Sequence, residues 1–249
     1  MPARTKRTAA LALAACLASS AAQALVGASE EGGPMASHAL MVLASSGSGG
    51  GFCTGVIIAP TVVLTAAHCV GAPQATRIYF KSGATPVFIE VAATAIHPQY
   101  RAQAPRTRER SIDLALIRTK TILHSAFKPV TLDDRKPRVG EAYGLSGFGV
   151  TREGRGDTGG ILRWGEVKAR APLSAILLWA EEPAGGGFGA CEGDSGGPVF
   201  ALDTGALVAI TSWSEGEGKA HCGKLTQAAL IAPQRAWIEG VLRGWGVTR

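Results

Sequence analysis

Residues 191–198 read Cys-Glu-Gly-Asp-Ser-Gly-Gly-Pro, and this stretch carries the strongest prediction in the sequence. A serine hydroxyl is a poor nucleophile unless a base removes its proton and donors hold the oxyanion that forms. Glycine at 193 lets a backbone N–H face the reacting carbonyl without a Cβ in the way. Glycines 196 and 197 allow tight passage of the chain behind the serine. The stretch predicts a nucleophile, Ser195, beside an oxyanion hole made by the N–H groups of Gly193 and Ser195.

Two other stretches supply the partners that such a serine needs. Leu64-Thr65-Ala66-Ala67-His68-Cys69 runs from a β-type segment into small residues and a histidine, whose near-neutral pKa suits a general base. Asp113 lies among apolar neighbours, where a carboxylate is costly unless it has a partner. We expect Asp113 to accept the other ring N–H of His68 and so fix its tautomer. A structural role is assigned to the remaining histidines, which are His38, His97, His124 and His221.

The N-terminus has the pattern of a secretory signal peptide. A basic lead at 4–7 precedes an apolar run at 9–18, and Ala-Gln-Ala at 22–24 is a small-x-small cleavage pattern. The apolar run is shorter than the ~20 residues of a membrane-spanning helix, which disfavours the alternative of a retained anchor. We expect residues 1–24 to be removed and the mature chain, 25–249, to be secreted to the periplasm or beyond, free of the membrane.

Composition narrows the function classes. Without the leader, 22 basic residues face 19 acidic ones, a net charge of +3 that makes no case for nucleic-acid binding. Four cysteines remain, an even number that suggests two disulfides in an exported chain, with three possible connectivities. No tight C-x-x-C pair suggests a zinc site, so neither a metal nor an organic cofactor is expected. The alanine-rich leader and the arginine and glycine content suggest a bacterial source.

Short β-type runs fill most of the mature chain, separated by glycine and proline, as is typical of an all-β sandwich or barrel. The predicted strands lie at 40–43, 56–58, 62–64, 78–80, 87–91, 115–117, 199–202 and 208–211. One helix is expected near 233–242, where Pro233 suits the first turn and Trp237, Ile238, Val241 and Leu242 share a face. Loops are expected at 45–51, 101–110 and 151–160, which are rich in glycine, serine or charge.

The sequences TAAHC, DLAL and GDSGGP, in this order, resemble those of the chymotrypsin/trypsin family of serine proteases. The resemblance covers the chain from Leu25 to about Val241. It implies two antiparallel six-stranded β-barrels with a C-terminal helix, a boundary between the halves near 121–140, and a catalytic triad at their junction. It implies a monomeric serine endopeptidase that cleaves peptide or protein substrates through an acyl-enzyme.

Two disulfides follow from the same resemblance. Cys53 with Cys69 would hold the turn that bears His68, and Cys191 with Cys222 would hold the walls of the substrate pocket. Closing a loop of the first size stabilises a fold by about 3 kcal/mol in the chain-entropy model.

The resemblance also suggests how activity arises. Family members often need a new N-terminus, commonly Ile-Val-Gly-Gly, whose ammonium pairs with the aspartate before the nucleophile. Cleavage after Ala24 exposes the similar Leu25-Val26-Gly27-Ala28. We expect the Leu25 amine to pair with Asp194 without a separate propeptide. The alternative is that residues 25–34 form a frayed tail and activation differs.

Substrate preference is inferred from the expected pocket. Its base falls on Gly189 and Ala190, where trypsin relatives carry an aspartate, and the wall residues Ser212, Trp213 and Ser214 resemble the family's Ser-Trp-Gly. An unpaired buried Lys or Arg costs several kcal/mol, so we expect small to medium apolar residues at P1, the residue before the cut. The backbone of Ser212 and Ser214 should pair with the substrate as an added strand. The charged residues that could alter this preference are Glu192, Glu215, Glu217 and Lys224.

Two further possibilities stay open. The arginine-rich segment 101–110 precedes Asp113 and could favour acidic residues at P2 to P4, although a solvated loop is the simpler reading. The activity could also differ: the same residues could form an inactive binding module or an esterase. An inactive member of the family would typically lack a triad residue or the oxyanion glycine. This chain has all four, which are His68, Asp113, Ser195 and Gly193.

Overall fold

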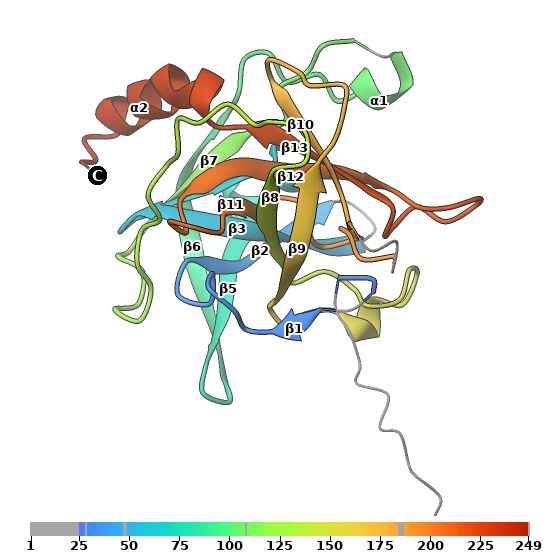
Figure 1. Ribbon diagram of the computed structural model, residues 1–249. Helices are drawn as coiled ribbons and strands as arrows, with labels where there is room; N and C mark the ends of the chain where they lie inside the picture. Colours follow the sequence, from blue (N-terminus) through green and yellow to red (C-terminus); the bar gives the residue numbers. More distant parts are fainter. Residues whose placement is uncertain (1–24, 28, 47–48, 108, 184–186, 249) are drawn as a thin grey trace, which may run out of the picture.

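The computed structural model describes residues 25–27, 29–46, 49–107, 109–183 and 187–248. The predicted signal peptide, residues 1–24, lies outside these ranges. The described chain forms two antiparallel β-barrels of six strands each, packed side by side, with a short helix at the C-terminus (Figure 1). The predicted fold class is therefore confirmed.

The first barrel closes in the order β2-β3-β4-β7-β6-β5. Its strands are β2 (Ala39–Ser46), β3 (Gly49–Ala59), β4 (Val62–Thr65), β5 (Thr76–Ser82), β6 (Thr85–Ile96) and β7 (Ala115–Thr119). Side chains alternate along β2, so that Leu40 and Val42 are buried inside the barrel against Ile57, Val63 and Ile78. Branched apolar residues at these inward positions favour strands and fill the interior of the barrel.

The second barrel has the order β9-β10-β13-β12-β11-β8, and β9 also pairs with β8 to close it. Its strands are β8 (Ala142–Gly147), β9 (Arg163–Ala169), β10 (Leu177–Glu181), β11 (Pro198–Ala201), β12 (Leu207–Glu215) and β13 (Leu225–Leu230). The short β1 (Glu30–Glu31) is added at the edge of β9. Four of these strands, β8, β9, β10 and β13, were not predicted.

The barrels share one apolar core. The same cluster of buried residues includes Ile58 and Leu64 from the first barrel and Phe200 and Leu207 from the second. Helix α2 (Arg235–Gly244) follows the 3₁₀ turn η4 (Ala232–Gln234) and buries Ile238 and Leu242 against this cluster. No helix among the described residues is long and apolar enough to span a membrane.

The predicted loops contain more structure than expected. The strands β2 and β3 continue into segment 45–51, pairing Ala44 with Gly51 and Ser45 with Gly50. A backbone ladder needs no bulky side chains, so serine and glycine do not end these strands. The other two loops contain the single turn α1 (Ala104–Thr107) and the 3₁₀ turn η3 (Gly156–Thr158). Two more 3₁₀ turns are η1 (Ala67–Cys69) and η2 (Pro73–Ala75).

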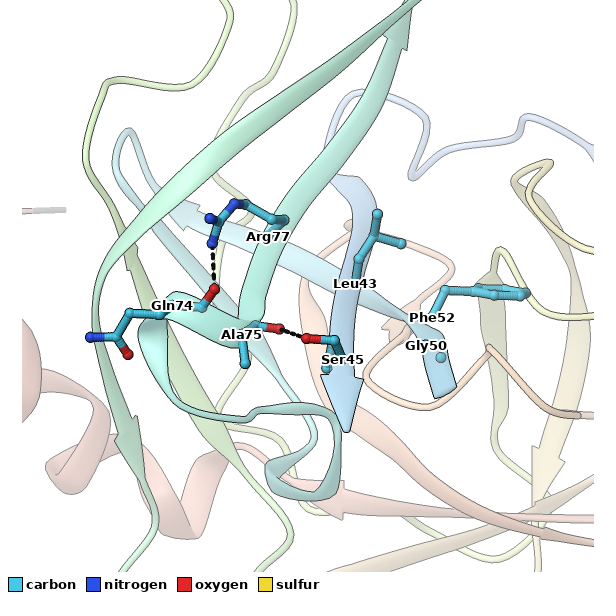
Figure 2. Close-up of a pocket in the computed structure, with 9 residues that line it drawn as sticks. Leu43, Ser45, Gly50, Phe52, Gln74, Ala75 and Arg77 are labelled. Atoms are coloured by element: carbon cyan, nitrogen blue, oxygen red, sulfur yellow. Dashed lines mark hydrogen bonds between the residues drawn. The ribbon is translucent and has the colours of Figure 1, made fainter. Parts of the chain in front are cut away.

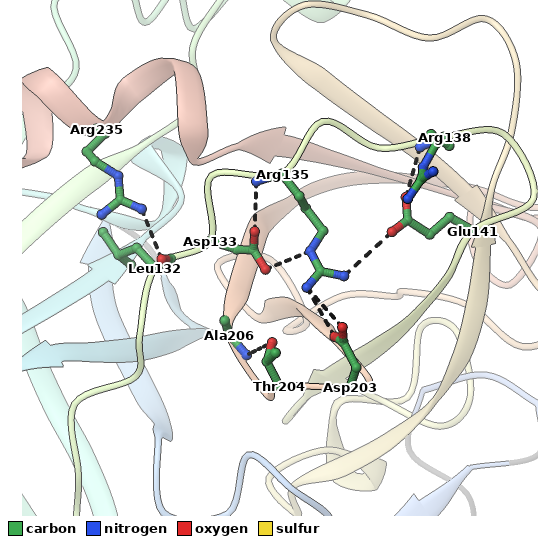
Figure 3. Close-up of polar contacts among 9 residues, drawn as sticks. All are labelled: Leu132, Asp133, Arg135, Arg138, Glu141, Asp203, Thr204, Ala206 and Arg235. Atoms are coloured by element: carbon green, nitrogen blue, oxygen red, sulfur yellow. Dashed lines mark hydrogen bonds and ion pairs between the residues drawn. The ribbon is translucent and has the colours of Figure 1, made fainter.

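An ion-pair network fixes the connection between β7 and β8 to the second barrel (Figure 3). Arg135 contacts Asp133 at 2.7 Å, Asp203 at 3.1 Å and Glu141 at 3.6 Å. Asp203 belongs to the turn between β11 and β12, so the network joins segments that are far apart in sequence. Networks of this kind stabilise more than isolated surface pairs do.

Candidate active site

His68 lies in η1, directly after the buried strand β4. The buried Ala66 and Ala67 leave room for the imidazole close to the backbone. The disulfide between Cys53 and Cys69 holds the turn, with 6.0 Å between the two Cα atoms. The histidine side chain remains 38% exposed, so a substrate can reach it.

Asp113 is the partner of His68. Its Oδ2 lies 2.7 Å from Nδ1 of His68, and its Oδ1 accepts the backbone N–H of His68 at 3.0 Å. Ser212 donates a further hydrogen bond to Oδ2 at 2.5 Å. Three hydrogen bonds from the protein therefore replace water around this carboxylate, whose side chain is only 14% exposed.

The electrostatics of this pair favour charge separation. Burial lowers the pKa of His68, but the hydrogen bond and charge of Asp113 outweigh this and hold the pKa above its ordinary value. Burial raises the pKa of Asp113, but the hydrogen bonds and charge of His68 and the hydrogen bond from Ser212 hold it below its ordinary value. An imidazolium at His68 is therefore stabilised by a carboxylate that stays ionised.

Ser195 lies between the two barrels. Its carbonyl accepts the N–H of Thr54 from β3, while the next residue, Gly196, donates to Thr211 on β12. A Cβ at Gly196 would lie 2.1 Å from the Thr54 carbonyl oxygen, so only glycine fits there. No hydrogen bond joins the hydroxyl of Ser195 to His68 in the described part of the chain. Such catalytic hydrogen bonds are often long before substrate binds.

The two predicted oxyanion donors lack acceptors among the described residues, and the first of them is fixed in direction. Neither the Gly193 nor the Ser195 N–H donates to any described acceptor. The carbonyl of Glu192 accepts the N–H of Val150 at 2.9 Å, and in a trans peptide this turns the Gly193 N–H to the opposite side. Gly193 has φ +93°, and a Cβ there would lie 2.3 Å from the Phe52 ring. Val150 was not predicted from the sequence.

Asp194 is buried behind this loop. It accepts the N–H of Gly149 at 2.8 Å and the N–H of Cys191 at 2.9 Å. Burial raises its pKa to about 7, although these two N–H groups lower it. The side chain of Leu25 is buried in the second barrel, and the carbonyl of Val26 accepts the N–H of Gly189 at 3.1 Å. The residues just after the predicted cleavage site are therefore part of the fold, as opposed to a frayed tail.

Two of the predicted pocket residues, Ala190 and Ser214, come together at Thr226. Gly189 and Ala190 are buried, and the disulfide between Cys191 and Cys222 closes the segment after them. The N–H of Ala190 donates to the hydroxyl of Thr226 at 3.0 Å, and Thr226 pairs with Ser214 across β12 and β13.

The register also corrects the pocket outline. Thr226 is only 1% exposed, whereas Lys224 is exposed to solvent. Thr226 was not predicted from the sequence and Lys224 was considered in its place, because the number of residues after Cys222 does not reveal the strand register.

Beyond Ser212, one edge of β12 is open. β11 pairs with β12 only between Leu207 and Ile210, so the edge from Ser212 to Glu215 has no strand partner in the described ranges. Beside this edge lies a cleft of about 830 Å³, which reaches His68 and Asp113. Trp179, Trp213 and Tyr100 line it, together with Arg101 and Arg110.

A second, smaller cavity of about 520 Å³ lies on the first barrel, between β2, β3 and β5 (Figure 2). Leu43, Ser45 and Phe52 line it, and Arg77 donates to the Gln74 carbonyl at 3.0 Å beside it. None of the predicted triad residues lines this cavity, so it is not the reacting centre. Phe52 lies between this cavity and the predicted oxyanion loop, because its ring also packs against Gly193.

Comparison with known proteins agrees with this geometry. A family model described as Trypsin matches residues 29–238. The chain belongs to the trypsin family. "Trypsin alpha" of Drosophila erecta is 29% identical over 77% of this chain and 78% of its own length, and mouse "Kallikrein-8" is 30% identical over 75% of each.

A solved structure is also similar to this trypsin-family chain. It is described as neuropsin, a serine protease expressed in the limbic system of mouse brain, and has a TM-score of 0.65 at 28% identity. The match covers 81% of this chain and 93% of that one. Family membership makes the chain a serine endopeptidase. The relatives named here come from insects and mammals, so the bacterial source stays a prediction.

Side chains of the types that bind metal ions lie close together at two places in the described part of this trypsin-family fold. Two groups of three potential ligands occur in the described residues, one with Cys53, His68 and Cys69 and one with Cys191, Glu192 and Cys222. In each group both cysteines are joined in a disulfide, which leaves no thiolate to bind a metal. The donor chemistry at these positions does not fit a metal site.

Proposed function

We propose that this serine endopeptidase cleaves peptide bonds with His68, Asp113 and Ser195 as its catalytic triad. The observation that carries the proposal is the 2.7 Å contact between Nδ1 of His68 and Asp113, which leaves Nε2 as the base for Ser195. His68 takes the proton of the Ser195 hydroxyl as Oγ attacks the carbonyl. It then gives that proton to the leaving amine, and water repeats the sequence on the acyl-enzyme.

The proposed oxyanion hole consists of the Gly193 and Ser195 N–H groups. Both lack an acceptor among the described residues, and the bond between Val150 and Glu192 supports the direction of the first. Donors that are already oriented stabilise a tetrahedral intermediate without reorganisation. Loss of one such donor typically slows turnover 10²- to 10³-fold.

We propose that removal of residues 1–24 during secretion creates the active form. The new Leu25 amine would pair with Asp194, whose buried carboxyl accepts two N–H groups from the described part of the chain. Leu25 has φ +57°, a left-handed conformation that costs an L-residue about 1–2 kcal/mol. Cutting the bond before Leu25 removes this restraint. Mass spectrometry of the secreted protein identifies its first residue and so tests the proposal. A fully active protein that starts at another residue would contradict it.

For specificity we propose small to medium apolar residues at P1. The support is a pocket base without charge, at Gly189, and a wall narrowed by Thr226 opposite Ser214. The open edge of β12 would pair with the substrate backbone as an added strand.

An acidic residue at P2 or P4 is the second element of the proposed specificity. Side chains alternate along an added strand, so P2 and P4 face away from the P1 pocket, toward the cleft beside His68. Arg101 and Arg110 line this cleft, and the Arg101 N–H donates to the hydroxyl of Ser111, the residue after Arg110, at 2.9 Å. Neither guanidinium forms an ion pair with a described residue. Two exposed carboxylates line the same cleft and are the competing charges, Glu109 next to Arg110 and Glu215 in β12.

The decisive experiment compares the mature protein with Ser195→Ala on peptide amides that differ only at P1. Turnover of Ala, Val or Leu amides that is lost in Ser195→Ala supports the triad and the neutral pocket together. Ester turnover without amide turnover favours the esterase alternative. No turnover of either substrate, with the N-terminus at Leu25, favours the binding module.

A further inference from the structure

Thr54 connects the first barrel to the predicted oxyanion loop of the second. It follows Cys53 in β3 and is completely buried. Its hydroxyl donates to the carbonyl of Gly193 at 2.9 Å and accepts the N–H of Phe148 at 3.0 Å. Its own N–H donates to the Ser195 carbonyl at 2.8 Å. One side chain and its backbone therefore contact both proposed oxyanion residues.

Gly193 needs such support because of its backbone freedom. Glycine rotates easily about φ and ψ, so the peptide that carries the Gly193 N–H can turn unless both sides of the residue are held. Val150 holds the preceding peptide through the Glu192 carbonyl. Thr54 holds the following peptide through the Gly193 carbonyl. The bond from Phe148 to the same hydroxyl places residues 148–150 relative to Gly193, which closes a ring of hydrogen bonds.

We propose that the Thr54 hydroxyl is a positioning group for the oxyanion hole. It touches no substrate and acts by keeping the Gly193 N–H directed at the reacting carbonyl. This inference rests on the proposed function, because it concerns the transition state of the same reaction. An interaction that orients only the oxyanion donors affects kcat and leaves substrate binding nearly unchanged.

The test replaces Thr54 with valine, which has the same shape without the hydroxyl. The expected result is a 10- to 100-fold fall in kcat on a peptide amide, with KM within about threefold of the wild-type value. This fall is smaller than the one expected when an oxyanion donor is deleted outright. Thr54→Ser keeps the hydroxyl and should stay within about threefold of wild type. Thr119→Val is the matched control, because Thr119 is buried in the same barrel and donates to Thr61 and Thr121, distant from the loop.

A second measurement separates positioning from general destabilisation. A peptide aldehyde that forms a tetrahedral adduct should bind Thr54→Val 10- to 100-fold more weakly, while a product peptide binds equally well. If Thr54→Val folds poorly, Thr54→Ala provides the same comparison. Equal losses for aldehyde and product, or a kcat within threefold of wild type, would overturn the inference. Absence of turnover in the wild type would instead refute the proposed function, and the inference with it.

Discussion

The proposed P1 pocket gives the most discriminating prediction. Thr226 is 1% exposed, faces Ser214 across the strand pair and accepts the N–H of Ala190. Thr226→Gly removes three heavy atoms from this wall. Since one methylene in a hydrophobic pocket changes transition-state binding by about 1–3 kcal/mol, kcat/KM for a Leu or Phe substrate should rise at least tenfold relative to Ala.

The substitution also has a cost that can be stated in advance. The buried N–H of Ala190 loses its acceptor, which destabilises the site by about 1–3 kcal/mol. Glycine inside β13 costs about 0.5–1 kcal/mol more. We therefore expect the Ala substrate to be cleaved more slowly by Thr226→Gly. The change in preference should appear as the Phe/Ala ratio of kcat/KM and not as a general gain.

Two matched variants separate volume from hydrogen bonding. Thr226→Val keeps the volume and loses the acceptor, so it should retain the preference for small P1 residues. Thr226→Ser keeps the acceptor and loses one methyl, so it should be intermediate. The assay is steady-state cleavage of amides with Ala, Val, Leu, Phe or Arg at P1. A Phe/Ala ratio unchanged in Thr226→Gly, or a wild-type preference for Arg, would refute the reasoning.

Three further outcomes are expected. At pH 8 the chain that begins at Leu25 should resist unfolding better than one extended by an alanine, because only a free amine pairs with ionised Asp194. The difference in free energy of unfolding between the two chains should shrink as pH falls through about 7, because the Asp194 carboxylate of the extended chain takes up a proton there. Urea unfolding at several pH values measures it, and a difference that does not change with pH would contradict this. Arg110→Gln should abolish an approximately fivefold preference for Glu over Gln at P2 or P4, whereas Arg106→Gln, outside the cleft, should keep it; equal loss in both would argue against a defined site. Arg135→Met should lower Tm by about 2–4 °C in calorimetry, for a loss of roughly 1 kcal/mol, with unchanged kcat; an unchanged Tm would show that the network adds no stability.

The sequence was less informative about the second barrel. Its unpredicted strands β8 and β13 read Ala-Tyr-Gly-Leu-Ser-Gly and Leu-Thr-Gln-Ala-Ala-Leu. Glycine and alanine have low β-propensity, so these segments carry little local signal. They become strands because neighbours pair with both and because their apolar side chains are buried in the barrel. The first barrel, rich in valine and isoleucine, was easier to predict for the opposite reason.

The proposed catalytic residues could be predicted from the sequence alone. The stretches around His68, Asp113 and Ser195 are short motifs of particular residue types at adjacent positions. Such motifs can be recognised in the sequence without knowledge of the fold. The pairing of Cys53 with Cys69 and of Cys191 with Cys222, implied by resemblance, is confirmed by the disulfides.

The distant residues that support those stretches could not be predicted from the sequence and follow from how the chain folds. Thr54 in β3 and Thr226 in β13 reach the proposed oxyanion loop and pocket through strand register, and a shift of one residue would turn their side chains away. Val150 reaches Glu192 from the loop after β8, through the packing of the second barrel. The five-residue pattern at 193–197 is local, whereas the Thr54 hydroxyl contacts Gly193 across 139 positions of sequence. A contact of that kind depends on how two barrels pack, and no short stretch of residues encodes it.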